Sequence, residues 1–179
     1  TYDVVVVRST WDYSVDADAF IEWATRVDEV SRLLNPSEII AWNTDKRYLR
    51  DLLEAGIKVV PTTFIEPGER LTVSTISSEA HAEFVVKPAV SAGSRDTMRY
   101  SVVDGLTSAA EHVDRLLDAD RVVMIQPYFP SVDTIGETAM VFIDDEFSHS
   151  IRKGPMLTAG REGNKVEGLP GGRIDERGI

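Results

Sequence analysis

The feature that most restricts the fold stands at the start of the chain, where Val4–Val7 form an uninterrupted β-branched run. Such a run is typical of a strand buried on both faces, as in a parallel sheet covered by helices. Apolar residues then recur at helical spacing over Asp16–Leu34, and Asn35-Pro36 should end that helix. A short strand at Glu38–Trp42 and a second helix that reaches Ala55 are expected next. This alternation of strand and helix predicts a parallel α/β layer.

After Gly56 the pattern changes to short strands with one intervening helix. The expected elements are strands at Ile57–Val60, Glu83–Lys87, Thr97–Val103 and Val122–Gln126, a helix at Leu106–Leu117, and a hairpin of Thr138–Asp144 and Glu146–Arg152. The glycine-rich tail from Gly154 predicts a mobile loop. The fold class that follows is mixed α/β, of the α+β kind.

Composition excludes several classes of protein. The 179 residues suffice for one domain, or one domain and part of another, and a hydrophobic content of 42% supports a buried core. A net charge of −11 argues against broad nucleic-acid binding. Without cysteine, no disulfide, zinc–thiolate site or thiol nucleophile can form. No signal peptide or apolar run of membrane-spanning length is visible, so a cytoplasmic location is expected. Because the chain opens on Thr1 rather than Met, we expect parts of the protein to be missing at both ends.

Lys87 ends an apolar strand and is followed by Pro88. A lysine in a strand is commonly a solvated residue of a sheet edge, and that interpretation stays open. The functional alternative is an ammonium group held on a rigid strand, which is a point charge suited to phosphate.

The loop Ser91–Thr97 consists largely of small residues, which let backbone N–H groups approach anionic oxygens closely. It is not a Walker sequence, because no Gly-Lys-Ser/Thr follows. The loop therefore predicts a phosphate nest, with an ordinary turn as the alternative.

An apolar strand that ends at Gln126 runs into Pro127-Tyr128-Phe129-Pro130. The two prolines favour an extended backbone, which could offer N–H and C=O groups to an adenine edge between aliphatic side chains. A plain linker between domains is the alternative. Further on, Glu137 could accept a ribose hydroxyl, whereas His149 is expected to be structural because it alternates with serines.

In their order along the chain, these features resemble the ATP-grasp superfamily. The motifs are Asn43-Thr44-Asp45-Lys46, Lys87-Pro88, the small-residue loop, Gln126-Pro127-Tyr128-Phe129, Gly136-Glu137 and Lys153-Gly154-Pro155. Within that superfamily the chain is similar to the glutathione-synthetase-like branch and to its O-ureido-D-serine cyclo-ligase family of D-cycloserine biosynthesis. The segments Arg8–Tyr13 and Lys87–Ser94 carry this narrower resemblance.

The resemblance implies ATP as the cofactor and assigns roles to single residues. Lys46 and Lys87 would hold the phosphates, and Glu137 the ribose. The other implied nucleotide-binding residues are Ser91, Ala92, Gly93 and Ser94 in the loop that closes over the triphosphate, and Gln126, Pro127, Tyr128 and Phe129 around adenine.

The resemblance also implies catalytic, substrate and metal positions. Lys153 or Arg152 would be the catalytic cation near an acyl phosphate. The residues expected to face the substrate are Arg8, Ser9, Trp11, Asp12 and Tyr13. The family binds magnesium through acidic and Asn residues on two strands. This chain offers no match for them before Ile179, so we expect the Mg ligands beyond that residue and assign no metal ligand within the chain.

For domain organisation, the resemblance implies that residues 1–42 are the remnant of a Rossmann-like domain that precedes the ATP-grasp domain. Residues 43–179 would be the ATP-grasp domain itself, built of two α+β subdomains. Its lid subdomain would span about 57–128, and the start of its C-terminal subdomain would span about 136–179.

The function implied is an ATP-dependent carboxylate–amine ligase, amide-forming or cyclising, that acts through an acyl phosphate. Its partners would be small amino-acid-like carboxylate and amine substrates, with no nucleic acid and no membrane, and a homodimer is left open. Two other classes remain: a non-catalytic nucleotide-binding paralogue that acts through a partner, and a purely structural α/β domain.

Overall fold

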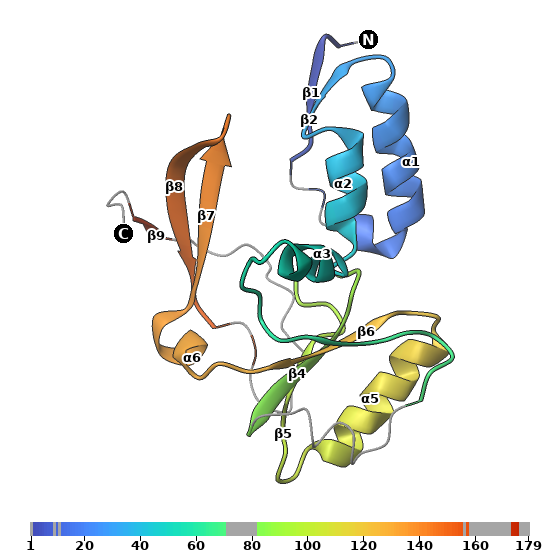
Figure 1. The fold of residues 1–179 in the computed structure, drawn as a ribbon, viewed down its shortest axis with the longest axis vertical. Coiled ribbons are helices and arrows are strands. Elements are labelled where there is room, and N and C mark those ends of the chain that lie inside the picture. The colour runs from blue at the N-terminus through green and yellow to red at the C-terminus, as the bar shows by residue number, and fades with distance from the viewer. Residues whose placement is uncertain are drawn as a thin grey trace.

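The computed structural model describes residues 2–8, 10, 12–70, 82–155 and 157, together with the backbone of 173–175. The described residues form three sheets, which lie one after another along the chain (Figure 1). The molecule is mixed α/β, as the sequence predicts. Within the described part of the chain, no helix has the length and apolar character needed to cross a membrane.

The N-terminal unit is a two-stranded parallel sheet with helices beside it. Its elements are β1 (Val4–Val6), the 3₁₀ helix η1 (Tyr13–Val15), α1 (Ala17–Asp28), β2 (Arg32–Leu34) and α2 (Ser37–Thr44). Val5 pairs with Leu33 across the sheet. The Asp16 carboxylate accepts a hydrogen bond from the Ala19 backbone at 3.0 Å and so caps α1.

Two elements of this unit differ from the prediction. The helix expected over Asp16–Leu34 ends at Asp28, because Arg32–Leu34 form β2 and pair with β1. The strand expected at Glu38–Trp42 is instead part of α2. The Asp28 carboxylate accepts hydrogen bonds from the backbone N–H and the hydroxyl of Ser37, both at 2.8 Å, and thereby stabilises the start of α2. The expected domain boundary at residue 42 lies inside α2.

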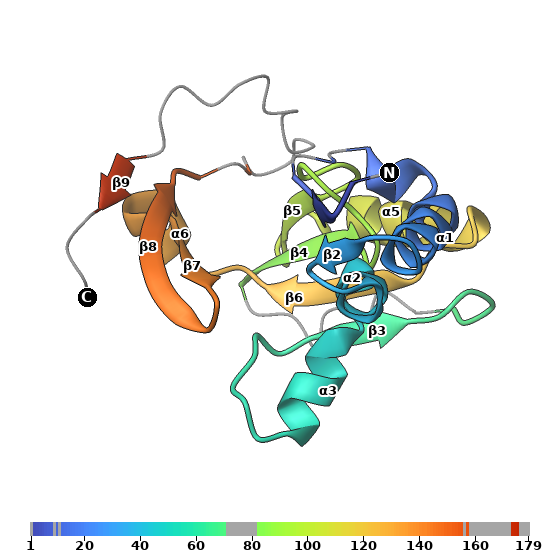
Figure 2. The same cartoon turned by 90° about the horizontal axis from the view of Figure 1, so that it is seen from above.

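The second unit is a four-stranded antiparallel sheet with the order β3-β6-β4-β5 and helix α5 on one face (Figure 2). Its elements are β3 (Thr63–Ile65), β4 (Glu83–Pro88), β5 (Met98–Ser101), α5 (Leu106–Asp118) and β6 (Val123–Pro127), and α3 (Tyr48–Glu54) precedes them. The strand expected at Ile57–Val60 does not form. The pairing begins after Pro61, where Ile65 is 1% exposed, whereas Ile57 is 51% exposed.

Alternation along β4 divides its residues between the core and the opposite face. Phe84 and Val86 are fully buried in the hydrophobic core beneath α5, together with Val113. Each such side chain stabilises the fold by about 1.5–3 kcal/mol. Successive side chains of a strand point to opposite faces. Val85 and Lys87 consequently project from the other side of the sheet.

The third unit follows α6 (Ser131–Ile135) and consists of β7 (Glu137–Ile143), β8 (Glu146–Lys153) and β9 (Arg173–Asp175). The predicted hairpin is present, and its turn residues Asp144 and Asp145 have φ of 54° and 62°, as expected for a two-residue hairpin turn. In Figure 1 the β7–β8 hairpin and the N-terminal unit both stand above the four-stranded sheet, the hairpin on the left and the N-terminal unit on the right. Of the tail predicted to be a mobile loop, 156 and 158–172 lie outside the described residues.

Candidate functional site

A cavity of about 510 Å³ lies on the face of the four-stranded sheet away from α5. It is lined by Lys46, Val60, Val85, Lys87, Ser91, Ala92, Gly93, Ser94, Thr97, Gln126, Pro127, Tyr128, Phe129, Val132, Glu137 and Leu157. Every residue that the sequence assigns to nucleotide binding is in this set. The fold thus brings together the residues assigned to nucleotide binding from five separate segments of the chain.

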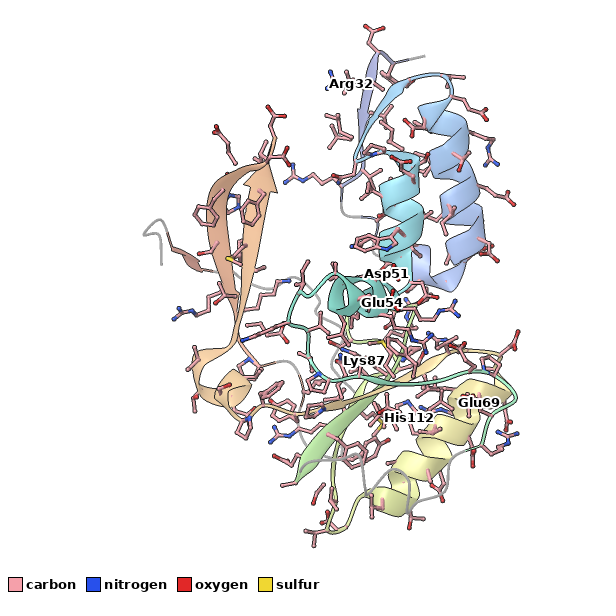
Figure 3. The ribbon with its side chains drawn as sticks, viewed as in Figure 1. Arg32, Asp51, Glu54, Glu69, Lys87 and His112 are labelled. Atoms are coloured by element: carbon pink, nitrogen blue, oxygen red, sulfur yellow. The ribbon has the colours of Figure 1, made fainter. Side chains whose placement is uncertain are left out.

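Lys87 enters the cavity from the end of β4, near the centre of the molecule (Figure 3). The interpretation as a solvated edge residue is wrong, because β4 lies between β5 and β6. Burial lowers the pKa of Lys87, and the nearby Glu137 carboxylate partly opposes that shift. The result is a cationic group from which water has been largely removed, a suitable partner for an anion.

Lys46 reaches the same cavity from the segment between α2 and α3. Its ammonium group donates to the carbonyl oxygens of Ser91 at 2.8 Å and Ala89 at 3.1 Å. Its pKa is lowered to about 8, first by burial and then by the positive charges of Lys87 and Arg121. Lys46 is therefore an ammonium group poised to gain stabilisation from a bound anion.

The loop 91–97 is a tightly folded turn rather than an open strand. Gly93, Ser94 and Asp96 have positive φ values of 62°, 58° and 52°. The Ser91 hydroxyl donates to the Arg95 carbonyl at 2.8 Å, which closes the turn on itself. A succession of such conformations directs backbone N–H groups into a concavity of the kind that binds anions.

Arg121 fastens this loop and was missed by the sequence analysis. Its guanidinium group donates to the Val90 carbonyl at 3.0 Å and to the Asp96 carboxylate at 2.5 Å, so it holds both ends of the loop. Arg121 lies in the connection between α5 and β6, and no motif marks it there. Only the fold brings it to the loop.

The segment Gln126–Phe129 forms another wall of the cavity. The Gln126 amide donates to the Thr62 hydroxyl at 2.8 Å, and the Tyr128 backbone N–H donates to the Glu83 carbonyl at 2.9 Å. Tyr128 is 8% exposed and Phe129 is 46% exposed. With Val85 and Val60, this wall is mostly apolar, which suits a flat heteroaromatic ring.

The two predicted catalytic cations do not line the cavity. Lys153 lies directly opposite Glu137 in the β7–β8 pair, and Arg152 lies opposite Thr138. Side chains of paired residues share a face of the sheet. Lys153 is therefore on the face of Glu137, which lines the cavity, and Arg152 is on the other face.

Among the predicted substrate residues that the structure describes, Tyr13 is joined to the cavity wall by a hydrogen bond. Its hydroxyl donates to the Ser91 carbonyl at 3.3 Å. Burial, and then the neighbouring Tyr48, raises the pKa of Tyr13. Arg8 and Asp12 are not in the cavity wall. Ser9 and Trp11 lie outside the described residues.

Among the described residues, no group of three or more His, Asp or Glu side chains is arranged to hold a metal ion. For ATP the donors do fit: two partly buried ammonium groups, a small-residue turn, an apolar wall and a carboxylate all line this cavity.

The fold is similar to that of the ATP-grasp proteins. An ATP-grasp RimK domain protein from Sphaerobacter thermophilus superposes with a TM-score of 0.64 over 86% of this chain and 55% of that chain, at 16% identity. The similarity at this identity concerns the fold alone, and it confirms the predicted fold class.

The chain is a homologue of the D-cycloserine synthetase DcsG. It is 40% identical over 162 residues to the cycloserine biosynthesis protein DcsG of Streptomyces lavendulae, with coverage of 87% of this chain and 53% of the relative. A crystal structure of D-cycloserine synthetase DcsG matches with a TM-score of 0.78 and 38% identity, over 88% of this chain and 54% of that one. The family profile described as "D-cycloserine synthetase DcsG, N-terminal domain" matches residues 1–35. The predicted resemblance is confirmed, and the chain spans about half the length of these relatives.

Proposed function

We propose that this chain is the nucleotide-binding part of an ATP-dependent ligase that forms C–N bonds. The observation that carries the proposal is the pair Lys46 and Lys87, two partly buried ammonium groups that line one cavity with loop 91–97. In this proposal they hold the triphosphate, while the segment Gln126–Phe129 and Glu137 hold the adenosine. The relatives that match most of the chain are named for cycloserine biosynthesis, which supports the same class of reaction.

The proposed reaction begins when a substrate carboxylate oxygen attacks the γ-phosphorus of ATP. The bond from that phosphorus to the β-phosphate oxygen breaks, and ADP leaves with the bonding electrons. The chain supplies position and positive charge rather than a nucleophile. Lys46 and Lys87 neutralise the phosphate oxygens as charge redistributes in a loose transition state. Lys153, on the face of Glu137, would stabilise the acyl phosphate that forms. An amine then displaces phosphate, which leaves with the bonding electrons, and an amide results.

The proposed substrates are small and amino-acid-like. The reaction joins a carboxylate to an amine, either within one molecule or between two molecules. Tyr13 supports a substrate position beside the loop, because its hydroxyl reaches the Ser91 carbonyl. No step of this proposal depends on a metal ion held by the described residues. Magnesium bound elsewhere in the whole protein would add neutralising charge at the phosphates.

The test has two stages. Calorimetric titration of this chain with ATP, with and without magnesium, should show binding, and GTP should bind more weakly. For the protein that contains the whole homologous length, ADP should be released only when carboxylate substrate is present, and hydroxylamine should trap the activated carboxylate as a hydroxamate. Release of ADP without any hydroxamate would contradict the acyl phosphate. Absence of ATP binding to both proteins would overturn the proposal.

A further inference from the structure

Arg99 on β5 is the centre of a polar cluster that the sequence did not reveal. Its Nε and Nη2 donate to the two Glu83 carboxylate oxygens at 2.9 and 2.5 Å. Its Nη1 donates to both carboxylate oxygens of Asp133, at 3.1 and 2.9 Å. The Arg99 side chain is only 11% exposed. The bidentate pair with Glu83 and the two hydrogen bonds to Asp133 hold this guanidinium group firmly in place.

Tyr128 connects this cluster to the cavity. The guanidinium carbon of Arg99 lies 3.6 Å from the centre of the Tyr128 ring. The Tyr128 hydroxyl donates to Asp133 at 2.5 Å, and its backbone N–H donates to the Glu83 carbonyl. The ring is thus held at its face, its hydroxyl and its backbone. Because Tyr128 also lines the cavity, the cluster determines where that wall stands.

The same cluster fixes the start of the third sheet. Asp133 belongs to α6, the short helix between the Gln126–Phe129 segment and β7. Gly136, which has a φ of 82°, turns the chain directly after α6 into Glu137, another residue of the cavity wall. Arg99 therefore ties the four-stranded sheet to the connection on which Glu137 depends. The side-chain hydrogen bonds of this cluster join Arg99, Glu83, Asp133 and Tyr128, and none of them reaches Lys46, Lys87 or loop 91–97.

We propose that Arg99 is a positioning residue for the nucleoside end of the cavity. It lies outside the cavity wall and acts through Tyr128 and Asp133, which set the positions of the Gln126–Phe129 segment and of Glu137. This inference rests on the proposed function, since it takes the cavity to be the adenine-nucleotide site. The loss of Arg99 should weaken the recognition of adenosine and leave the recognition of phosphates intact.

The experiment compares three ligands on this chain: adenosine, ATP and inorganic tripolyphosphate, each in competition with a fluorescent ATP analogue. Arg99→Met keeps the aliphatic stem and removes the guanidinium. We expect it to weaken adenosine and ATP by about 10-fold each, because at least one charge-assisted contact is lost. Tripolyphosphate affinity should stay within about 2-fold of the parent. Arg99→Lys should restore little, since an ammonium group cannot make the bidentate contacts.

The matched control is Arg70→Met. Arg70 also pairs with two carboxylates, Asp114 and Asp118, in the same unit, but it is 62% exposed and is not in the cavity wall. Its removal should change no affinity. If Arg99→Met does not fold, Asp133→Asn replaces it, because Asp133 is 38% exposed and its loss should be tolerated. Asp133→Asn should show the same selectivity with an effect of about 3-fold.

The outcomes separate the two proposals. If the parent chain binds ATP and the Arg99 variant binds adenosine equally well, the positioning role is wrong while the proposed function stands. An equal loss for all three ligands would also overturn it, because that result indicates a general loss of structure. A parent chain that binds none of the three ligands would overturn both.

Discussion

The ammonium groups of Lys46 and Lys87 face one cavity, and the charge of Lys87 contributes, after burial, to lowering the pKa of Lys46 to about 8. Two neighbouring cations that share a poorly hydrated space repel each other in the free protein. A polyanion between them would replace that repulsion with attraction. The unfavourable electrostatics of the free protein therefore indicate what the cavity is built to receive.

Binding of ATP should be coupled to uptake of a proton near pH 8. The folded-state pKa of Lys46 lies below its ordinary value of 10.5, so around and above pH 8 part of the population has lost the proton. Phosphate favours the charged form, so binding raises that pKa and draws a proton from the buffer. Titration calorimetry at pH 8.5 in buffers of different ionisation enthalpy should reveal this uptake, and affinity should fall by up to about 10-fold per pH unit above pH 8.

Lys46→Met should remove the part of this coupling that centres on pH 8. Lys87, whose pKa is also lowered, would then account for any coupling that remains. Lys58→Met is the matched control, because Lys58 is exposed and is not in the cavity wall. Equal proton uptake by the parent and by Lys46→Met would show that Lys46 does not meet the phosphates.

Lys87→Ala should weaken ATP binding by about 10- to 150-fold, which corresponds to one charge-assisted hydrogen bond of roughly 1.5–3 kcal/mol. The fold should survive, because the neighbouring Phe84 and Val86 are fully buried and hold β4 in place. Lys87→Arg should rescue little, since a planar fork does not replace a compact ammonium group in a narrow site. Calorimetry measures the affinity for ATP, and circular dichroism checks that the fold is retained. Lys58→Ala is the control. Parent-like affinity in Lys87→Ala would remove this residue from the site.

The elements that the sequence predicted best are those that local residue patterns determine. β4 and β6 are short apolar runs that end at prolines, and α5 has one apolar face, so the core and the cavity-facing residues Lys87 and Gln126 could be placed in advance. The small-residue loop was likewise recognisable from its composition. Side chains that reach the cavity from consecutive elements were therefore largely predictable.

What the sequence could not supply depends on contacts between distant residues. The apolar run Glu38–Trp42 is too short for its periodicity to distinguish a strand from a helix, and the Asp28–Ser37 hydrogen bonds that decide for the helix are tertiary. Arg99 and Arg121 carry no motif, because their significance arises only when Asp133 and Asp96 are folded against them. That Lys153 shares the face of Glu137 while Arg152 lies on the other face also required the register of β7 on β8.

Arg121→Met should loosen loop 91–97, because it removes the group that joins Val90 to Asp96. Hydrogen exchange of the amides in this loop should become at least about 10-fold faster, as a lost contact of about 1.4 kcal/mol implies. Tripolyphosphate affinity should fall while adenosine affinity stays unchanged, the opposite of the pattern expected for Arg99. Arg70→Met is again the control. Unchanged exchange in the loop would show that its own turns suffice to hold it.

Gly136→Ala should destabilise the junction between α6 and β7. A Cβ atom at this position would stand 2.2 Å from the Lys153 carbonyl oxygen, and the φ of 82° is one that alanine adopts only with strain. Either the backbone of β8 must move or the pairing of Glu137 with Lys153 must open, at a cost of about 1–3 kcal/mol.

Gly154→Ala, where a Cβ would meet nothing within 4 Å, is the matched control. Because the substituted position adjoins β7 and β8, amide exchange of these two strands measures the effect more directly than global unfolding. Exchange there should accelerate in Gly136→Ala alone, and adenosine affinity should fall with it, since Glu137 directly follows the altered turn. Equal exchange in the two alanine variants would mean that the junction relaxes freely and that its geometry is not what places Glu137.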